Sequence, residues 1–160
     1  MTIEMIKQKS YLPIEHYVPH RATMLLLDAL LEASAEHAVA SVRVPRDGMF
    51  NQPQGVPTWV TVEYMAQTVA AWAGWCALER GDAVKVGFLL GTRKLQVTQP
   101  FVPAGEQLSV RVQCELLAGN GLGMFDSCVM LGEQVIAQAK ISVFEPEDGK
   151  AYLHALQEEK

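Results

Sequence analysis

The sequence has little of what metal, redox and nucleic-acid chemistry requires. Only three cysteines and four histidines occur among 160 residues, and no two cysteines form a CxxC pair. Their spacing favours neither a zinc site nor a disulfide framework, so we expect no metal and no cofactor. The net charge of −5 provides no basic field for nucleic acid. Because nothing points to disulfides, we expect a reducing, cytoplasmic setting.

Targeting and membrane signals are scarce as well. The first eleven residues lack the apolar core of a signal peptide. Residues 59–78 have the length of a membrane span, but Glu63 and Gln67 lie in the first half and amphipathic segments follow, so we expect no span. With 49% hydrophobic and 19% charged residues, the chain is typical of one folded domain, 1–160, with its core at 11–144.

The run at 59–78 is the most apolar part of the chain. Fifteen of its twenty residues are apolar, and Glu63 is its only charge. Gln67 follows one helical turn later and shares a helix face with Glu63. A carboxylate held out of water costs several kcal/mol unless it is paired or protonated, so a buried one usually has a function. Glu63 is therefore a candidate for proton transfer; the alternative is a Glu63 that reaches the surface or pairs with an arginine.

Hydrophobic periodicity predicts the remaining elements. Strands are expected at 24–33, 38–44, 84–97, 107–116, 124–131 and 134–144. Residues 45–57 contain three prolines and two glycines and read as a loop, with Pro57 suited to the first turn of the helix. The segment 148–160 is expected to be a short helix or a tail. Hairpin-length links mean antiparallel pairing, and one helix on the buried face gives an α+β domain. One sheet cannot enclose so apolar a helix, so a partner subunit should complete its burial.

Four segments carry a resemblance to a known family. They read VPHRATMLLLD at 18–28, VEYMAQ at 62–67, GFLLG at 87–91 and PFVPAGEQL at 100–108. Together they resemble the 3-hydroxyacyl-[acyl-carrier-protein] dehydratases of fatty-acid and polyene synthesis, and most of all the aryl-polyene type. The resemblance covers about residues 11–144. It implies the hotdog fold, an antiparallel β-sheet wrapped around one long central helix.

The resemblance also implies a reaction and roles for several residues. These lyases remove water from 3-hydroxyacyl thioesters and give trans-2-enoyl thioesters. Glu63 matches the helix carboxylate, which would protonate the departing hydroxyl group. Gln67 would orient Glu63 or bind that hydroxyl, and backbone amides around Pro57, Thr58 and Trp59 would polarise the thioester oxygen.

One residue of the family pattern is missing. Members carry a histidine fourteen residues before the helix carboxylate, and this chain has Met49 there, followed by Phe50. His20, in the P-H-R motif, is the candidate replacement, and a structural role for it is equally open. The other three histidines, His16, His37 and His154, have no supporting motif. Our hypothesis is that His20 and Glu63 form the working pair.

The substrate and partners follow from the same resemblance. Phe50, Phe88, Leu90 and Gly91 are expected to contact the acyl substrate, which is carried by acyl carrier protein or coenzyme A. Arg21, Arg93 and Lys94 are candidates for contacting the acidic carrier protein, or are simply solvated. The assembly is expected to be a homodimer or larger homo-oligomer, or a heteromer with another dehydratase. Two alternatives stay open: a hotdog thioesterase, and a non-catalytic acyl-binding or partner subunit.

Overall fold

Alternating apolar side chains build a six-stranded antiparallel sheet in the computed structural model, which describes residues 10–159. The strands run in the order β1 (Ala29–Ala33), β2 (His37–Arg43), β6 (Gln107–Leu117), β7 (Leu122–Leu131), β8 (Gln134–Phe144) and β4 (Phe88–Val97). A second, two-stranded ladder joins β3 (Val56–Pro57) to β5 (Phe101–Val102). The predictions made for residues 1–9 and 160 lie outside the described part of the chain.

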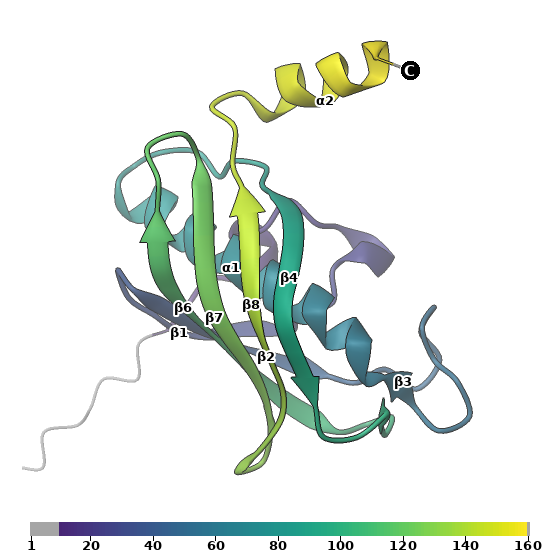
Figure 1. Cartoon of the computed structure of the whole chain (residues 1–160). Helices are drawn as coiled ribbons and strands as arrows, with labels where there is room; N and C mark the ends of the chain where they lie inside the picture. Colours follow the sequence, from purple (N-terminus) through teal and green to yellow (C-terminus); the bar gives the residue numbers. More distant parts are fainter. Residues whose placement is uncertain (1–9, 160) are drawn as a thin grey trace, which may run out of the picture.

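The long helix α1 (Thr61–Glu79) lies across the inner face of the sheet, which curves around it (Figure 1). A single 3-10 turn, Thr58–Val60, precedes the helix. The core between helix and sheet consists of fully buried side chains from both layers: Met65, Val69 and Trp72 of α1, Val110 and Val112 of β6, and Ile136 and Ile141 of β8. The predicted antiparallel sheet wrapped around one central helix is confirmed.

The first and third predicted strands begin later than expected. Residues 24–27 do not join the sheet: Ala22–Met24 form a 3-10 turn, and β1 starts at Ala29 after one backbone hydrogen bond from Asp28 to Ser41 of β2. The reason is a competing partner, because the backbone N–H of Leu26 donates to the side chain of Gln67 instead of to a strand. Likewise β4 begins at Phe88 rather than at residue 84. Its register shifts between Leu89 and Gly91, which marks a β-bulge at this point.

The start of the helix also differs from the prediction. Pro57 lies before the first turn and pairs with Phe101 in the β3–β5 ladder. Trp59, at the start of the apolar run, is 60% exposed, although Thr58 and Val60 in the same 3-10 turn are buried. The prediction of a fully buried run from residue 59 is therefore wrong at its beginning.

The C-terminal segment forms a second helix, α2 (Gly149–Glu158), which extends beyond the sheet (Figure 1). Asp148 caps it by accepting a hydrogen bond from the N–H of Ala151 at 3.0 Å. Tyr152 packs against Phe88 of β4 and Phe144 of β8, with ring centroids 5.1 and 5.4 Å apart. These contacts attach α2 to the edge of the sheet.

Close packing of α1 against the N-terminal segment gives the first prediction. A Cβ added at Gly74 would lie 1.9 Å from the carbonyl oxygen of Tyr17, a backbone atom that cannot rotate away. Gly74→Ala should therefore lower the free energy of unfolding by about 3 kcal/mol or prevent folding. Urea denaturation measures the effect. Gly119→Ala is the control, because no atom lies within 4 Å of its added Cβ, and equal loss in both variants would contradict this packing.

Candidate active site

Glu63 lies near the start of α1, where two cavities meet. One, of about 270 Å³, is lined by Met24, Leu26, Met49, Phe50 and Trp59 as well as Glu63, and is called the Met49 cavity below. The other, of about 230 Å³, is lined by Glu63, His20, Ala66, Ala70, Ala73 and Phe88 among others, and is called the His20 cavity. Both walls are mainly apolar, as in sites for small organic ligands.

The Glu63 carboxylate is half-buried rather than fully buried. It makes no ion pair with any residue in the described part of the chain, so the alternative of an arginine partner is wrong. Its one hydrogen bond comes from Gln67, whose Nε2 donates to the Glu63 Oε1 at 3.2 Å. An unpaired acid that opens to two apolar cavities can exchange a proton with a molecule bound in either one.

Gln67 is fully buried and uses its whole amide within the protein. Its Nε2 also donates to the carbonyl of Met24 at 2.7 Å, and its Oε1 accepts from the N–H of Leu26 at 2.9 Å. Both N–H groups are therefore engaged. Of the two roles predicted for Gln67, this geometry supports the orientation of Glu63 and leaves no donor for a substrate hydroxyl.

His20 lines the His20 cavity with Glu63, so the fold brings the two predicted residues to one space. Its Nδ1 is buried and has no hydrogen-bond partner in the described structure. Burial lowers the pKa of His20 below 6.5, the nearby Glu63 opposes this shift, and Arg21 adds to it. The imidazole is therefore neutral near pH 7. No hydrogen bond or ion pair joins His20 to Glu63 within residues 10–159.

Met49 occupies the place from which the missing histidine would face the carboxylate. It lines the Met49 cavity together with Glu63, and it is 58% exposed. Phe50 beside it contacts Trp59 edge to face, with ring centroids 6.1 Å apart. A histidine at position 49 would approach Glu63 through a different cavity from the one that contains His20.

The predicted amide site at the helix start is wrong for Thr58. Its N–H donates to the carbonyl of Pro100 at 2.9 Å, and its hydroxyl donates to the carbonyl of Gln99 at 2.6 Å. Pro57 has no N–H, so neither residue can polarise a thioester oxygen. Both instead connect the start of the helix to the turn before β5.

The predicted substrate contacts divide into two groups. Phe50 lines the Met49 cavity and Phe88 lines the His20 cavity. Leu90 and Gly91 line neither cavity: Leu90 is exposed at the β4 bulge, and Gly91 lies beyond it. A bulge turns residues out of the ladder, and here it turns this part of β4 away from Glu63.

The three predicted carrier-protein contacts do not gather on one surface. Arg21 donates to the carbonyls of Val18 and His20 at 2.6 and 2.7 Å, which holds the loop that presents His20. Arg93 and Lys94 lie on β4, where Lys94 lines a groove on the opposite face of the sheet. A joint role in docking a carrier protein therefore receives no support from their arrangement.

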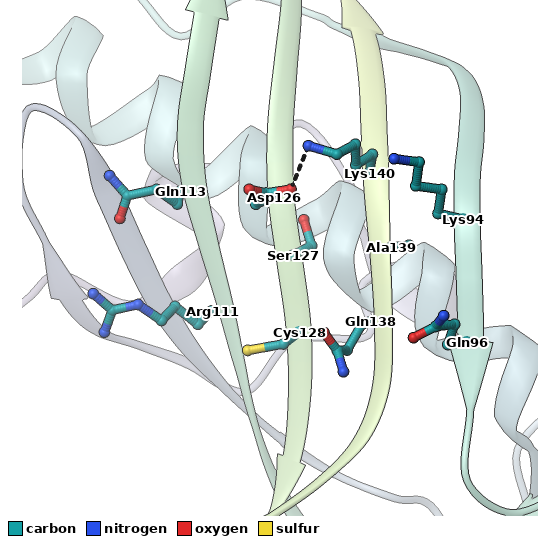
Figure 2. A pocket seen from close by; sticks show the side chains of 10 residues that line it. All are labelled: Lys94, Gln96, Arg111, Gln113, Asp126, Ser127, Cys128, Gln138, Ala139 and Lys140. Carbon is teal, nitrogen blue, oxygen red and sulfur yellow. Dashed lines mark ion pairs between the residues drawn. The ribbon is translucent and has the colours of Figure 1, made fainter.

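That groove, of about 390 Å³, crosses the outer face of β4, β6, β7 and β8, with α1 behind the sheet (Figure 2). An ion-pair cluster occupies it: the Nζ of Lys140 lies 3.0 Å from Asp126 and 2.9 Å from Glu115. Burial raises the pKa of the Cys128 thiol, which disfavours a reactive thiolate there. We therefore assign the candidate active site to the Glu63 cavities and not to this larger groove.

Sequence reasoning missed several lining residues. Ala66, Ala70 and Ala73 follow Glu63 at helical spacing and form the small-residue wall of the His20 cavity. Their spacing was a readable signal, because residues three and four apart share a helix face. Trp59, which lines the Met49 cavity, lies in the turn before the helix and does not share this helical spacing.

Among residues 10–159, no three His, Cys, Asp or Glu side chains lie together in a way that could hold a metal ion. Within the same part of the chain, neither helix has both the length and the hydropathy needed to cross a membrane.

A family model described as ApeP-like, ApeP dehydratase, matches residues 12–154. The chain is similar to a chain of "The Dehydratase Heterocomplex ApeI:P from Xenorhabdus doucetiae", with 29% identity, TM-score 0.84, and coverage of 92% of this chain and 99% of that chain. No curated protein matches it.

More distant structures share the fold. One is a hypothetical thioesterase from Streptococcus pneumoniae, solved with coenzyme A, at 11% identity and TM-score 0.56, covering 73% of this chain and 84% of that chain. Another is the E. coli PaaI protein from the phenylacetic acid degradation operon, at 13% identity and TM-score 0.56, covering 72% and 80%. With these neighbours, the hotdog fold implied by the sequence resemblance is confirmed.

The lowered pKa of His20 predicts how stability depends on pH. The unfolded chain binds a proton at His20 near pH 6.5, whereas the folded chain binds it only at lower pH. The stability from neutral His20 is therefore complete above pH 6.5 and is lost as the pH falls from 6.5 through the folded pKa. Urea midpoints measured from pH 8 to 5 should fall less steeply for His20→Gln than for the parent protein. The exposed His154→Gln is the control; identical pH profiles for His20→Gln and the parent would contradict the assignment.

Proposed function

Because this chain belongs to the ApeP-like dehydratase family, we propose that it dehydrates 3-hydroxyacyl thioesters to trans-2-enoyl thioesters, on acyl carrier protein or coenzyme A. One observation carries the proposal: an unpaired, half-buried carboxylate, oriented by Gln67, opens to two apolar cavities. An acyl chain fits such walls, and a carboxyl group in this position can exchange a proton with it. The three free thiols accord with a cytoplasmic location.

The proposed reaction needs one acceptor and one donor of a proton. Neutral His20 takes the proton from C2, which the thioester carbonyl makes acidic. The electron pair left at C2 forms the double bond to C3, and the C3 hydroxyl leaves with a proton from the Glu63 carboxyl group, as water. His20 ends protonated and Glu63 ends ionised, so one proton transfer between them restores the starting state. The position of His20 on the same cavity as Glu63 supports its assignment as the acceptor.

The assembly belongs to the proposal. Ala66, Ala70 and Ala73 leave one side of α1 only half-covered, and the edge strand β4 exposes Leu89 and Leu95. Unpaired edges and open apolar faces are usually covered in folded proteins. We propose that a second subunit covers them, either another copy or a second dehydratase. The similarity to the ApeI:P heterocomplex supports the second arrangement.

A second candidate function rests on Met49. Since the loop histidine of the resembling enzymes is replaced, the chain would bind acyl thioesters or support a partner that carries the complete pair. The two functions differ in a simple measurement: the isolated chain turns over 3-hydroxyacyl thioesters in the first, and only a mixture with a catalytic partner does so in the second.

Substitution of the two proposed catalytic residues tests the mechanism. General acid and base groups each contribute roughly 10²- to 10⁴-fold to a rate, so Glu63→Gln and His20→Ala should each lower kcat at least about 100-fold. Formation of the enoyl thioester from a 3-hydroxyacyl-coenzyme A is followed by its ultraviolet absorbance, with thiol release measured in parallel.

The exposed His154→Ala is the matched control and should keep full activity. Unchanged turnover in Glu63→Gln would end the proposal. Release of free thiol without enoyl product would instead identify a hydrolase of the thioester.

Position 49 offers a gain-of-function test. Met49→His places an imidazole on the Met49 cavity beside Glu63, so dehydration should rise about tenfold or more. Met24→His is the matched control, because Met24 lines the same cavity but does not stand where the family has its histidine. Equal gains in both variants, or a gain that survives Glu63→Gln, would contradict cooperation between position 49 and the helix carboxylate.

A further inference from the structure

The turn between β1 and β2 carries a serine, a histidine and a glutamate in hydrogen-bond contact. Oγ of Ser34 lies 2.7 Å from Nδ1 of His37. The other ring nitrogen of His37, Nε2, lies 3.0 Å from Oε1 of Glu32. None of the three lines either Glu63 cavity, and the dehydration proposed above uses none of them.

The direction of each hydrogen bond follows from the carboxylate. An ionised carboxylate can only accept, so Nε2 of His37 carries the ring proton and donates to Glu32. Nδ1 is then left to accept from the hydroxyl group of Ser34. A serine that donates to an imidazole, which in turn donates to a carboxylate, is the arrangement that activates serine as a nucleophile.

Backbone amides of the same turn add to this activation. The N–H groups of Glu36 and His37 both donate to Oγ of Ser34, each at 3.2 Å. Hydrogen bonds to an oxygen favour its negatively charged form. The N–H of Ala35, the residue after the serine, makes no hydrogen bond within residues 10–159. It is therefore available to donate to a substrate carbonyl oxygen on which negative charge develops.

The turn is accessible and held in place. The side chains of Ser34 and His37 are half-buried, and the residue after the serine is exposed. Nε1 of Trp72 donates to the carbonyl of Ser34 at 2.9 Å, and the N–H of Cys114 donates to the carbonyl of Glu36 at 2.8 Å. The three groups therefore keep their geometry at a position that a substrate can reach.

This turn borders the groove on the outer face of the sheet. His37 of β2 lies directly opposite Gln113 of β6, and Gln113 lines that groove (Figure 2). Side chains opposite each other in an antiparallel ladder share a face, with Cβ atoms about 5 Å apart. Arg111 lies two residues from Gln113 on the same face and also lines the groove. A molecule with its carbonyl group at Ser34 can therefore extend into the groove.

The charges of the groove indicate which molecule fits. Lys140 is engaged by Asp126 and Glu115. Arg111 and Lys94 make no ion pair with any residue in the part of the chain that the structure describes. Opposite charges attract, so two uncompensated cations favour a ligand that carries a negative charge over one that is wholly apolar.

We propose that Glu32, Ser34 and His37 form a second active site, which hydrolyses carboxylic esters whose acyl group ends in a carboxylate. Ser34 is the nucleophile, His37 the general base and then the general acid, and Glu32 orients the imidazole. Arg111 contacts the carboxylate of the acyl group.

The reaction takes place in two steps. Oγ of Ser34 attacks the ester carbonyl carbon while Nδ1 of His37 takes the hydroxyl proton. The bond from that carbon to the alcohol oxygen breaks, and the alcohol leaves with the proton from His37. Water then attacks the acyl ester of Ser34 in the same manner, which releases the acid and restores the serine and the neutral imidazole. Glu32 stays ionised and stabilises the protonated imidazole.

Covalent labelling of the unaltered protein tests the nucleophile without any variant that has to fold. A fluorophosphonate phosphonylates an activated serine with loss of fluoride, and peptide mass spectrometry locates the adduct. Ser34 should be labelled. Ser109 is the internal control, because it is half-buried on the same sheet face and has no histidine bonded to it in the described structure. Absence of label at Ser34, or equal labelling of Ser109, would overturn the proposal.

Turnover of two esters of equal chain length tests the reaction and its preference. The substrates are para-nitrophenyl hexanoate and the para-nitrophenyl monoester of adipic acid, followed by nitrophenolate absorbance. Neither carries a hydroxyl group that dehydration could remove, so the result is independent of the proposed dehydration. kcat/KM should be roughly three- to tenfold higher for the adipate ester, as one accessible charge pair allows. Equal values for the two esters would overturn the proposal.

Four variants complete this experiment. Ser34→Ala and His37→Gln should each lower turnover of both esters at least about 100-fold. His154→Gln is the matched control for His37, because His154 has a carboxylate partner, Glu158 at 3.3 Å, but no serine. Arg111→Gln should abolish the preference for the adipate ester. Hydrolysis that persists in Ser34→Ala, or an equal loss in His154→Gln, would assign the activity to another site and overturn the proposal.

Discussion

The buried amide of Gln67 is the contact on which the candidate site depends. It joins three groups from two distant parts of the chain: the carbonyl of Met24, the N–H of Leu26 and the carboxylate of Glu63. A buried backbone group without a partner is costly. The Gln67 side chain therefore supplies the hydrogen bonds that a neighbouring strand would otherwise supply to the segment before β1. It keeps that segment out of the sheet, and the segment becomes a wall of the Met49 cavity. The same amide fixes the orientation of the acid.

The Glu63 carboxyl group therefore faces two cavities, the His20 cavity and the Met49 cavity. His20 lines one cavity and Met49 lines the other, at the position where the resemblance to 3-hydroxyacyl dehydratases would place a histidine. A neutral imidazole on one side and a thioether on the other distinguish this chain from that pattern. The chemistry of the Glu63 carboxylate is therefore decided by what shares each cavity with it.

Local pattern was enough to predict much of the fold. Strands β6, β7 and β8 alternate cleanly and are joined by tight turns, so their pairing follows from neighbours in sequence. Two of the errors share one cause, which is a hydrogen bond to a distant residue. Leu26 bonds to Gln67 and so leaves the sheet, and the Thr58 amide is taken by Pro100. Motif resemblance brought His20 and Glu63 together correctly, but the connection between the cavities depends on tertiary packing that no spacing reveals.

The C-terminal helix has a practical consequence. Tyr152 of α2 packs against Phe88 with a tilt of 48° between the rings, and Phe88 forms part of the wall of the His20 cavity. A change in the position of α2 would therefore move a side chain that lines this cavity. Reporter groups for this protein therefore belong away from α2.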